Sequence, residues 1–280
     1  MQNPVIDSYQ NSNISSIRNM AKIFVGTSGF SYNDWRNNFY PARLPNSDFL
    51  SFYSREFDVV ELNFSYYRMP EPSQCRRMLE KSGHRVEFVI KAFRGLTHEV
   101  TDQSIPEILP QFKDSLAPFW EDNKLGAILL QFPQSFHYTT ESRVYLESLI
   151  REFSPMPVCV EFRQKEWLRD SVYATLREMK TGFVCVDEPQ IRGLLPPVAL
   201  ATSNIGYIRF HGRNRSKWYT GDAKERYDYL YSEDELQEWL PKISTVAEQT
   251  EKIFMFFNNH RKGQAITNAR MLIGLLDKLE

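Results

Sequence analysis

The chain contains no apolar run long enough for a membrane-spanning helix. No stretch approaches the ~18 consecutive apolar residues that such a helix needs, and the N-terminus lacks the basic-then-apolar order of a secretory signal. Cysteine is also scarce: Cys75, Cys159 and Cys185 are the only three, they lie far apart, and none forms a C-x-x-C pair. We therefore expect neither a disulfide framework nor a structural zinc site, and we predict a cytoplasmic protein without a membrane partner.

Net charge of either sign is nearly absent as well. The chain has 34 Lys and Arg residues against 35 Asp and Glu residues, which gives a net charge of −1. Without a global positive field, binding to nucleic acid would need a local basic patch. The sequence also shows no internal linker, low-complexity tract or repeat, so we predict a single domain over residues 21–280. Residues 1–20 are rich in Asn and Ser without sustained periodicity, which predicts a disordered N-terminal extension.

Eight short runs of apolar, β-branched and aromatic residues do recur along the chain. Each ends in polar or charged residues, and segments with helical periodicity separate most of them. Strands buried on both faces have this appearance, and their alternation with helices favours an α/β fold, the (β/α)8 TIM barrel of eight parallel strands. The strands are expected to end near Gly29, Tyr66, Arg94, Pro133, Arg163, Pro189, Arg213 and His260.

Two local signals refine the expected helices. Ser232 and Glu235 form an S-x-x-E capping box, which predicts a helix that continues to about Gln249. The pair Pro196-Pro197 predicts a short or missing helix after the sixth strand, because proline cannot donate a backbone hydrogen bond.

Side-chain alternation predicts which charges point into the barrel. In the run PVCVEFR, Val158, Val160 and Phe162 should pack on helices, so Glu161 and Arg163 should face the interior. Catalytic groups of such barrels lie at the carboxyl ends of the strands, so a site is expected at this rim. The same alternation gives these inward-facing polar residues on three other strands: Glu61 and Asn63, Cys185 and Asp187, Arg209 and His211.

Nine runs, in order along the chain, resemble the motifs of one protein family. They include VVELNFSYYRMP, VEFRQKEW and FFNNHRKGQAITNA, and together they extend from about Lys22 to the C-terminus. The chain resembles the domain-of-unknown-function-72 family, also called YecE-like. That resemblance implies a (β/α)8 barrel, in agreement with the strand pattern, and it implies no settled activity. Two positions depart from the family pattern: Phe30 stands where Trp is usual, and Gln164 stands where His commonly follows the E-F-R motif.

Three carboxylates are the candidate catalytic acid and base groups: Glu61, Glu161 and Asp187. Mutual proximity and partial burial would push their pKa values apart and give one proton donor and one acceptor. In the structural alternative, the two glutamates only form salt bridges with nearby Lys and Arg residues. Many barrel glycosidases place their acids after strands four and seven, where this chain has Gln131 and Arg209, so a glycosidase is disfavoured.

The run KAFRGLTHE brings Lys91, Arg94 and His98 to the end of the third strand. Lys91 is expected to bind an anion or a hydroxyl group. A Schiff base between Lys91 and a carbonyl substrate would need a lowered pKa, which nearby carboxylates oppose. His211 and the three carboxylates have the composition of a divalent metal site, but the arginines and lysines of the same rim would repel a cation. We therefore expect neither a metal nor a cofactor.

The loop after the seventh strand, HGRNRSKWYTGD, is the strongest ligand signal. Loops after strands seven and eight often hold phosphate in such barrels. The cations of these loops predict a phosphate, carboxylate or nucleic-acid backbone ligand, and their aromatic residues can form a stacking wall. The expected substrate-binding residues are Lys91, Arg94, Arg163, Arg209, His211, Arg213, Lys217, Trp218, Asn258 and Asn259.

These features predict an enzyme that performs acid and base chemistry, a hydrolysis or an isomerisation, on a small anionic or polyhydroxylated, sugar-like substrate. Two alternatives stay open. One is a nucleic-acid-binding or repair-type barrel, with the basic loops on phosphates. The other is a noncatalytic ligand-binding protein. Affinity for a nucleic acid would fall steeply with salt concentration, whereas affinity for a small substrate would not.

Overall fold

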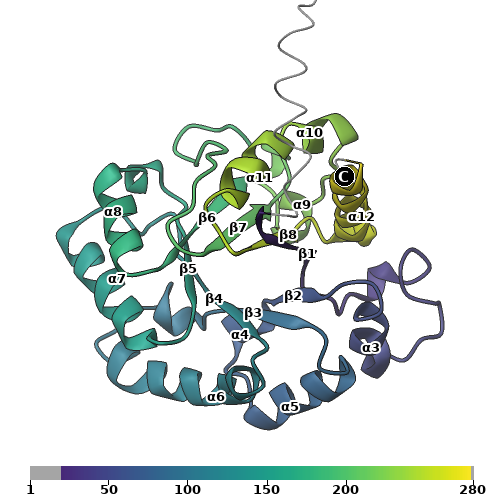
Figure 1. Cartoon of the computed structure of the whole chain (residues 1–280), viewed down its shortest axis with the longest axis horizontal. Helices are drawn as coiled ribbons and strands as arrows, with labels where there is room; N and C mark the ends of the chain where they lie inside the picture. Colours follow the sequence, from purple (N-terminus) through teal and green to yellow (C-terminus); the bar gives the residue numbers. More distant parts are fainter. Residues whose placement is uncertain (1–19, 279–280) are drawn as a thin grey trace, which may run out of the picture.

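The computed structural model of the chain describes residues 20–278, so all but the last residue of the extension predicted for residues 1–20 lies outside the described part. Eight parallel strands form one closed barrel, in which each strand pairs with the next and β8 pairs with β1 (Figure 1). The predicted (β/α)8 TIM barrel is confirmed. The strands are β1 Lys22–Ser28, β2 Val59–Leu62, β3 Glu87–Lys91, β4 Leu125–Gln131, β5 Val158–Glu161, β6 Gly182–Asp187, β7 Ile205–Phe210 and β8 Lys252–Phe257.

All eight strands end earlier than the sequence pattern predicts. The difference runs from one residue at β1 to four at β2, which ends at Leu62 rather than at Tyr66. Tyr66 lies instead in a short helix, α4 Phe64–Tyr67. The Ser65 hydroxyl lies 2.6 Å from the carbonyl oxygen of Lys91 and so ties this helix to the end of β3. An aromatic run therefore indicates a strand, but it does not indicate the residue at which hydrogen bonding to the neighbouring strands ends.

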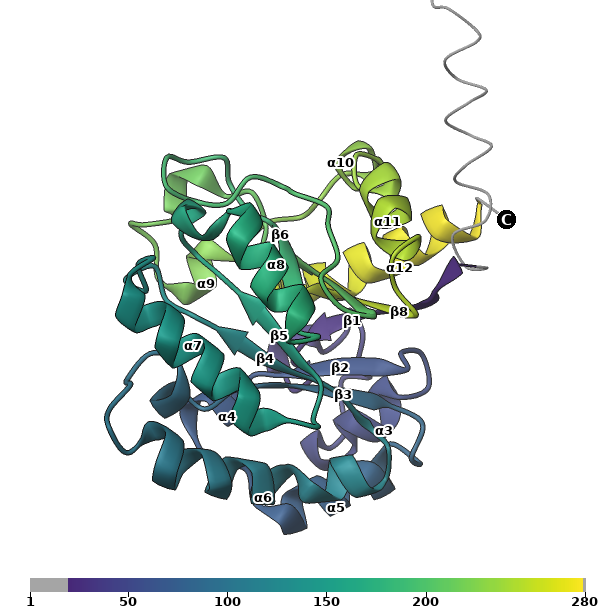
Figure 2. The ribbon, with the colours of Figure 1, turned by 60° about the vertical axis from the view of Figure 1, so that its left-hand side comes forward.

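Helices cover the outside of the barrel (Figures 1 and 2). Between β6 and β7, residues 188–204 contain no helix, as the Pro196-Pro197 pair predicts. The outward-facing side chains of the strands pack on this outer layer, and Phe162 stacks on Trp167 with 4.5 Å between ring centroids. The remaining α-helices of the described residues are α3 Phe49–Tyr53, α5 Pro72–Lys81, α6 Leu109–Glu121, α7 Thr140–Phe153, α8 Asp170–Glu178, α9 Ala223–Arg226, α10 Glu233–Gln237, α11 Leu240–Ala247 and α12 Gln264–Asp277.

One predicted helix is divided into two. The capping box of Ser232 and Glu235 is present, but α10 ends at Gln237 and α11 begins at Leu240. Pro241 explains the break, because a continuous helix would need an N–H at this position to reach the carbonyl four residues earlier. The prediction of one uninterrupted helix to about residue 249 was therefore wrong.

The barrel interior changes from apolar to polar toward the carboxyl ends of the strands. Tyr207 contacts Phe256 and Phe254, with ring centroids 5.4 and 6.4 Å apart, and all three side chains are fully buried. The Tyr207 hydroxyl donates to the Glu61 carboxylate at the end of β2, at 2.5 Å. This aromatic layer therefore lies directly beneath the polar site inside the barrel.

Candidate functional site

Arg209 of β7 is the centre of a buried group of charges. Its Nε and Nη2 donate to the two oxygens of Glu61 at 2.9 and 2.7 Å, and its Nη1 donates to Glu161 at 2.5 Å. Arg209 is 2% exposed, and both carboxylates are fully buried. Side chains from β2, β5 and β7 thus meet inside the barrel. The inward direction that alternation predicts for these three residues is confirmed.

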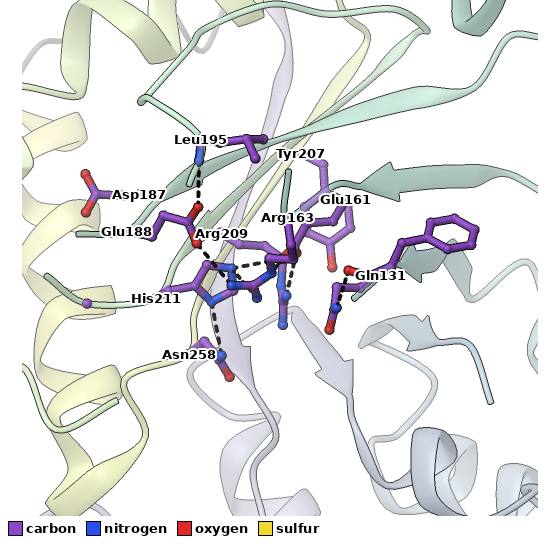
Figure 3. Close-up of polar contacts among 12 residues, drawn as sticks. Gln131, Glu161, Arg163, Asp187, Glu188, Leu195, Tyr207, Arg209, His211 and Asn258 are labelled. Atoms are coloured by element: carbon purple, nitrogen blue, oxygen red, sulfur yellow. Dashed lines mark hydrogen bonds and ion pairs between the residues drawn. The ribbon is translucent and has the colours of Figure 1, made fainter. Parts of the chain in front are cut away.

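Arg163 extends this group of charges. Its Nε contacts Glu161 at 2.6 Å, and its Nη1 contacts Glu188, just after β6, at 3.1 Å. The other oxygen of Glu188 accepts the backbone N–H of Leu195 at 3.0 Å (Figure 3). Although burial raises the pKa of Glu161, Arg163 and Arg209 together hold it well below its usual range. Burial raises the pKa of Glu188 to about 7, and Arg163 offsets only part of that effect.

His211 completes the group as a neutral ring. Burial, with a further contribution from the charge of Arg163, lowers the pKa of His211 to about 3. The side-chain nitrogen of Asn258 lies 3.1 Å from Nδ1, and Glu161 lies 3.2 Å from Nε2. Nη2 of Arg163 lies 3.1 Å from the same Nε2, so Asn258, Glu161 and Arg163 together hold the ring in place. We call Glu61, Glu161, Arg163, Glu188, Arg209 and His211 the inner cluster.

Lys91, the last residue of β3, differs from the arginines of the inner cluster. Its Nζ lies 4.3 Å from the centroid of the Tyr66 ring and makes no hydrogen bond or ion pair with any residue between 20 and 278. Lys91 does not pair with Glu61, because Arg209 occupies both oxygens of that carboxylate. Burial, together with the charges of Arg209 and Arg163, lowers the pKa of Lys91 to about 7.

A pocket of about 270 Å³ borders the inner cluster. Arg163 lines one side, and the loop after β7 lines another with Trp218 and Arg226. The Arg226 guanidinium lies 5.9 Å from the centroid of the Trp218 ring, and its Nε is buried without a hydrogen-bond partner among the described residues. The pocket is lined by His98, Gln131, Pro133, Gln134, Arg163, Leu194, Trp218, Tyr219, Arg226 and Tyr227.

The local sequence holds this loop over the pocket. Gly212 opens the loop with a φ of 88°, and a Cβ at this position would lie 2.7 Å from the Cβ of Tyr229, so glycine is required. The Asn214 side chain then donates to the carbonyls of Glu225 and Asp228 at 3.0 and 3.2 Å. These bonds fix the segment that carries the aromatic wall of the pocket.

Asp187 does not join the inner cluster. Phe183 on the same face of β6 packs edge-on against Tyr173 of α8, at 5.5 Å between ring centroids, so this face of the strand points outward. The predicted inward direction of Asp187 was therefore wrong. Its neighbour Glu188 points inward instead, and Figure 3 shows the two carboxylates pointing in different directions.

Asp187 anchors a second group of charges outside the barrel. Its carboxylate accepts from Arg213 at 2.8 Å, from the Tyr231 hydroxyl at 2.7 Å and from the Trp239 indole at 2.7 Å. Arg213 also contacts two glutamates of the α10–α11 region, at 3.5 and 2.9 Å. Arg213 thus has carboxylates around it rather than a free face toward a ligand. We call Asp187, Arg213, Tyr231, Glu235, Glu238 and Trp239 the outer cluster.

The other predicted ligand contacts are divided between the pocket and the periphery. Trp218 lines the pocket. Arg94 and Lys217 are each more than 40% exposed and pair with glutamates at 3.1 and 3.4 Å. Asn259 is fully buried and donates to Asn268 of α12 at 2.8 Å, so it points away from the inner cluster.

Three residues of the site were not predicted from the sequence: Glu188, Arg226 and Tyr227. Glu188 is adjacent to Asp187, and alternation cannot decide between neighbouring acidic residues when the direction of one strand is misjudged. Arg226 and Tyr227 belong to a polar segment without a strand pattern. The mixture of charged and aromatic residues in KERYDY was the available signal.

A larger groove, of about 750 Å³, lies at the carboxyl ends of β1 and β2. Its lining includes Tyr32, Asn63 and the cations Arg68, Arg77 and Lys81. The side-chain oxygen of Asn63 is buried without a hydrogen-bond partner among the described residues. The groove and the smaller pocket share no lining residue, so they are two separate hollows.

Three features concern the chain as a whole. Cys75, Cys159 and Cys185 are buried and free. No helix between residues 20 and 278 has the length and apolar character needed to cross a membrane. Within the same range, no group of three or more His, Cys, Asp or Glu side chains is arranged to hold a metal ion.

Comparisons with known proteins agree on one family. The family model described as protein of unknown function DUF72 matches residues 24–280. The UPF0759 protein YunF of Bacillus subtilis (strain 168) is 32% identical over 270 residues, which cover 91% of this chain and 95% of that protein. The crystal structure of a DUF72 family protein from Thermotoga maritima MSB8 is 37% identical with a TM-score of 0.84, and the match covers 91% of this chain and 99% of that chain. A DUF72 family protein from Enterococcus faecalis V583 is 27% identical with a TM-score of 0.79, over 91% and 95% of the two chains. The chain therefore belongs to the DUF72 family, as the resemblance of its nine runs predicts.

Proposed function

We propose that this protein is an enzyme that binds a small anionic substrate at the carboxyl end of the barrel and performs acid and base chemistry on it. The observation that supports this is the pair Lys91 and Glu188, whose pKa values of about 7 leave each group partly protonated at neutral pH. Glu188 contacts Arg163 of the pocket lining at 3.1 Å, and Lys91 and His98 of the pocket lining both contact the Tyr66 ring. Groups with such pKa values near a pocket are suited to exchange protons with a substrate. Hydrolysis and isomerisation both use this chemistry.

The substrate anion is proposed to bind in the pocket between Arg163 and Arg226. Arg163 uses Nε and Nη1 on carboxylates, and its Nη2 lies 3.1 Å from the His211 ring. Because a guanidinium has five N–H donors, two are left for a ligand. Arg226 makes no ion pair with any described residue, and its Nε is buried and unpaired. Trp218 and Tyr227 supply aromatic faces. Two cations of the loop after β7 that the sequence favoured already pair with carboxylates, which weakens the nucleic-acid alternative.

Glu61 and Glu161 are assigned a different role from the one that the sequence predicts. Their oxygens contact Arg209, Arg163 and the Tyr207 hydroxyl. The pKa of Glu161 lies well below its usual range, so this group does not carry a proton at neutral pH. We infer that the two glutamates fix the arginines in place, which prepares the electrostatic environment of the substrate.

Anion binding is tested by thermal unfolding in phosphate, citrate or glyoxylate against sodium chloride of equal ionic strength. A ligand that binds only the folded protein raises the melting temperature. Arg226→Gln should remove this rise, because it removes a pocket cation without breaking an ion pair. Arg215→Gln is the matched control, since Arg215 is an exposed arginine of the same loop. Equal rises in wild type and both variants would exclude the pocket as the anion site.

Proton transfer is tested without a known substrate. Mixtures of hydroxy acids, oxo acids and sugar phosphates are incubated with the protein in D2O and followed by NMR. Exchange of a substrate C–H for C–D, or a new product, should appear with wild type and be lost in Lys91→Met and Glu188→Gln. If anions bind in the pocket but no compound exchanges or reacts, the noncatalytic ligand-binding alternative becomes the better account.

A further inference from the structure

Lys91 has the surroundings of a nucleophile. It ends β3 at the mouth of the barrel, it is partly exposed, and it makes no ion pair with a described residue. The carboxylates that would keep its ammonium group charged form ion pairs with arginines instead. Glu61 pairs with Arg209, and Glu161 pairs with both Arg209 and Arg163. A lysine amine becomes reactive when it is desolvated and when its neighbours are cationic. Both conditions hold for Lys91.

Lys91 is also close to the pocket. His98 lines the pocket, and its ring lies 4.8 Å from the Tyr66 ring, whose centroid is 4.3 Å from the Lys91 Nζ. After burial, the charge of Lys91 is the next contribution to a His98 pKa lowered to about 4. Arg163 lines the same pocket and acts on Lys91 in the same way. The Lys91 amine therefore lies near the part of the pocket that His98 lines.

We propose that Lys91 forms a Schiff base with a small carbonyl acid, in which the two pocket arginines bind the carboxylate and Nζ attacks the carbonyl carbon. This inference rests on the proposed function and names its substrate class, an oxo acid. It goes beyond proton transfer because a covalent bond joins substrate and protein.

The step is balanced as a condensation. The neutral amine of Lys91 forms the new N–C bond while the carbonyl π electrons move to oxygen, giving a carbinolamine after proton transfer from nitrogen to oxygen. Loss of the oxygen as water, with one further proton, leaves a protonated imine. No oxidant, reductant or cofactor takes part. The iminium nitrogen then withdraws electrons from the neighbouring carbon, which is the use that enzymes make of such lysines.

The pKa of Lys91 makes the reaction feasible at neutral pH. An ordinary lysine, with a pKa of about 10.4, has on the order of one amine in a thousand or fewer neutral at pH 7. Lys91, with a pKa of about 7, has about half. Other lysines of the same chain therefore serve as internal references for its reactivity.

The test is reductive trapping in the full-length protein. Wild type is incubated with glyoxylate or pyruvate and sodium cyanoborohydride at pH 7, and peptides are analysed by mass spectrometry. Hydride reduces an imine to a stable secondary amine, so each trapped lysine carries the reduced acid. We expect the adduct at Lys91 to form at least about tenfold faster than at Lys262, an exposed lysine after β8, because a far larger fraction of its amine is neutral.

Three variants complete the design. Lys91→Arg keeps a positive charge and should abolish the fast adduct, whereas Lys262→Arg should leave it unchanged. Arg226→Gln should slow trapping of glyoxylate but not of neutral acetone, because only the acid uses the pocket cations. Trapping at Lys91 no faster than at Lys262, or unchanged fast trapping in Lys91→Arg, would overturn the proposal.

The two proposals fail in different ways. If glyoxylate raises the melting temperature in an Arg226-dependent manner but leaves Lys91 unlabelled, the Schiff base is wrong and the anion-binding enzyme stands. If Lys91 is labelled rapidly without any effect of Arg226→Gln, the nucleophile is confirmed and the pocket assignment is wrong.

Discussion

The inner and outer clusters are built from the same kinds of residue, at the ends of neighbouring strands, yet their surroundings differ. In the outer cluster, Asp187 is 1% exposed and accepts from Arg213, Tyr231 and Trp239. In the inner cluster, Arg163 borders an open pocket and shares its donors among two carboxylates and the His211 ring. Full pairing closes one cluster, while the other faces a space that a ligand can enter.

The two clusters differ in how many partners their charged groups have. The outer cluster supplies three donors to the Asp187 carboxylate, so this buried group needs no further partner. Beside the inner cluster, Lys91 has no carboxylate, and Glu188 has a pKa raised to about 7. Buried or half-buried ionisable groups that lack a full set of partners cost stability and are concentrated at functional sites. The number of hydrogen-bond and ion-pair partners of each charged group, rather than its charge, therefore separates a structural cluster from a candidate site.

The largest expected effect comes from removing the centre of the inner cluster. Arg209→Met would leave Glu61 buried without a guanidinium and Glu161 with Arg163 alone, and breaking a buried pair in this way costs about 3–5 kcal/mol. Urea unfolding of the variant and wild type at pH 7 measures the loss. A loss below about 1 kcal/mol would mean that water reaches these carboxylates and that the inner cluster is not buried as described.

The second prediction concerns the pH dependence that Glu188 gives to stability. The folded protein keeps a proton on Glu188 up to about pH 7, whereas an ordinary glutamate releases it near 4.5. The folded state therefore binds more protons in this window, so the contribution of Glu188 to stability is fully present below pH 4.5 and is lost as the pH rises to about 7.

The glutamine of the variant Glu188→Gln cannot ionise, so the variant should not lose stability in this way as the pH rises. Above pH 7 the variant should be more stable than wild type, by up to about 3 kcal/mol for a shift from 4.5 to about 7. Below pH 4.5 the two should be nearly equal. The difference between their unfolding free energies, measured from pH 4 to 8, isolates Glu188 from His98 and His211, which titrate equally in both proteins. A difference that does not change with pH would show that Arg163 keeps Glu188 ionised throughout.

Part of the fold and part of the candidate site were predictable from the sequence. The barrel was predictable because eight buried runs separated by helical segments allow few other folds. Glu61, Glu161, Arg163 and Arg209 were placed correctly by alternation, which depends only on strand geometry. Partner choice was not predictable, because it depends on which residues of distant strands and loops meet. The assignment of β6 failed for a related reason: a strand buried on both faces, GFVCVD, has no polar face to fix its direction.

The loop after β7 shows the same limit. Its cations predict an anion site when counted along the sequence, but the structure gives Arg213 three carboxylates and Lys217 one. Arg226, nine residues beyond Lys217, is the residue of this loop with a buried, unpaired Nε at the pocket. Charge in a loop therefore indicates a ligand only after the acidic residues of the same face have been counted.

The smallest expected effect comes from the outer cluster. Arg213→Met removes one of three donors to Asp187 but leaves Tyr231 and Trp239 in place, and Arg213 is 24% exposed. We expect a loss of about 1–2 kcal/mol, below that of Arg209→Met, because the remaining donors partly satisfy the carboxylate. The rise in melting temperature caused by phosphate or glyoxylate should be unchanged, since Arg213 does not line the pocket. Lys217→Ala is the control, with a change of about 0.5 kcal/mol or less for an exposed pair. If Arg213→Met instead abolishes the rise while unfolding is unaffected, the outer cluster opens to bind anions, and the division between a closed and an open cluster is wrong.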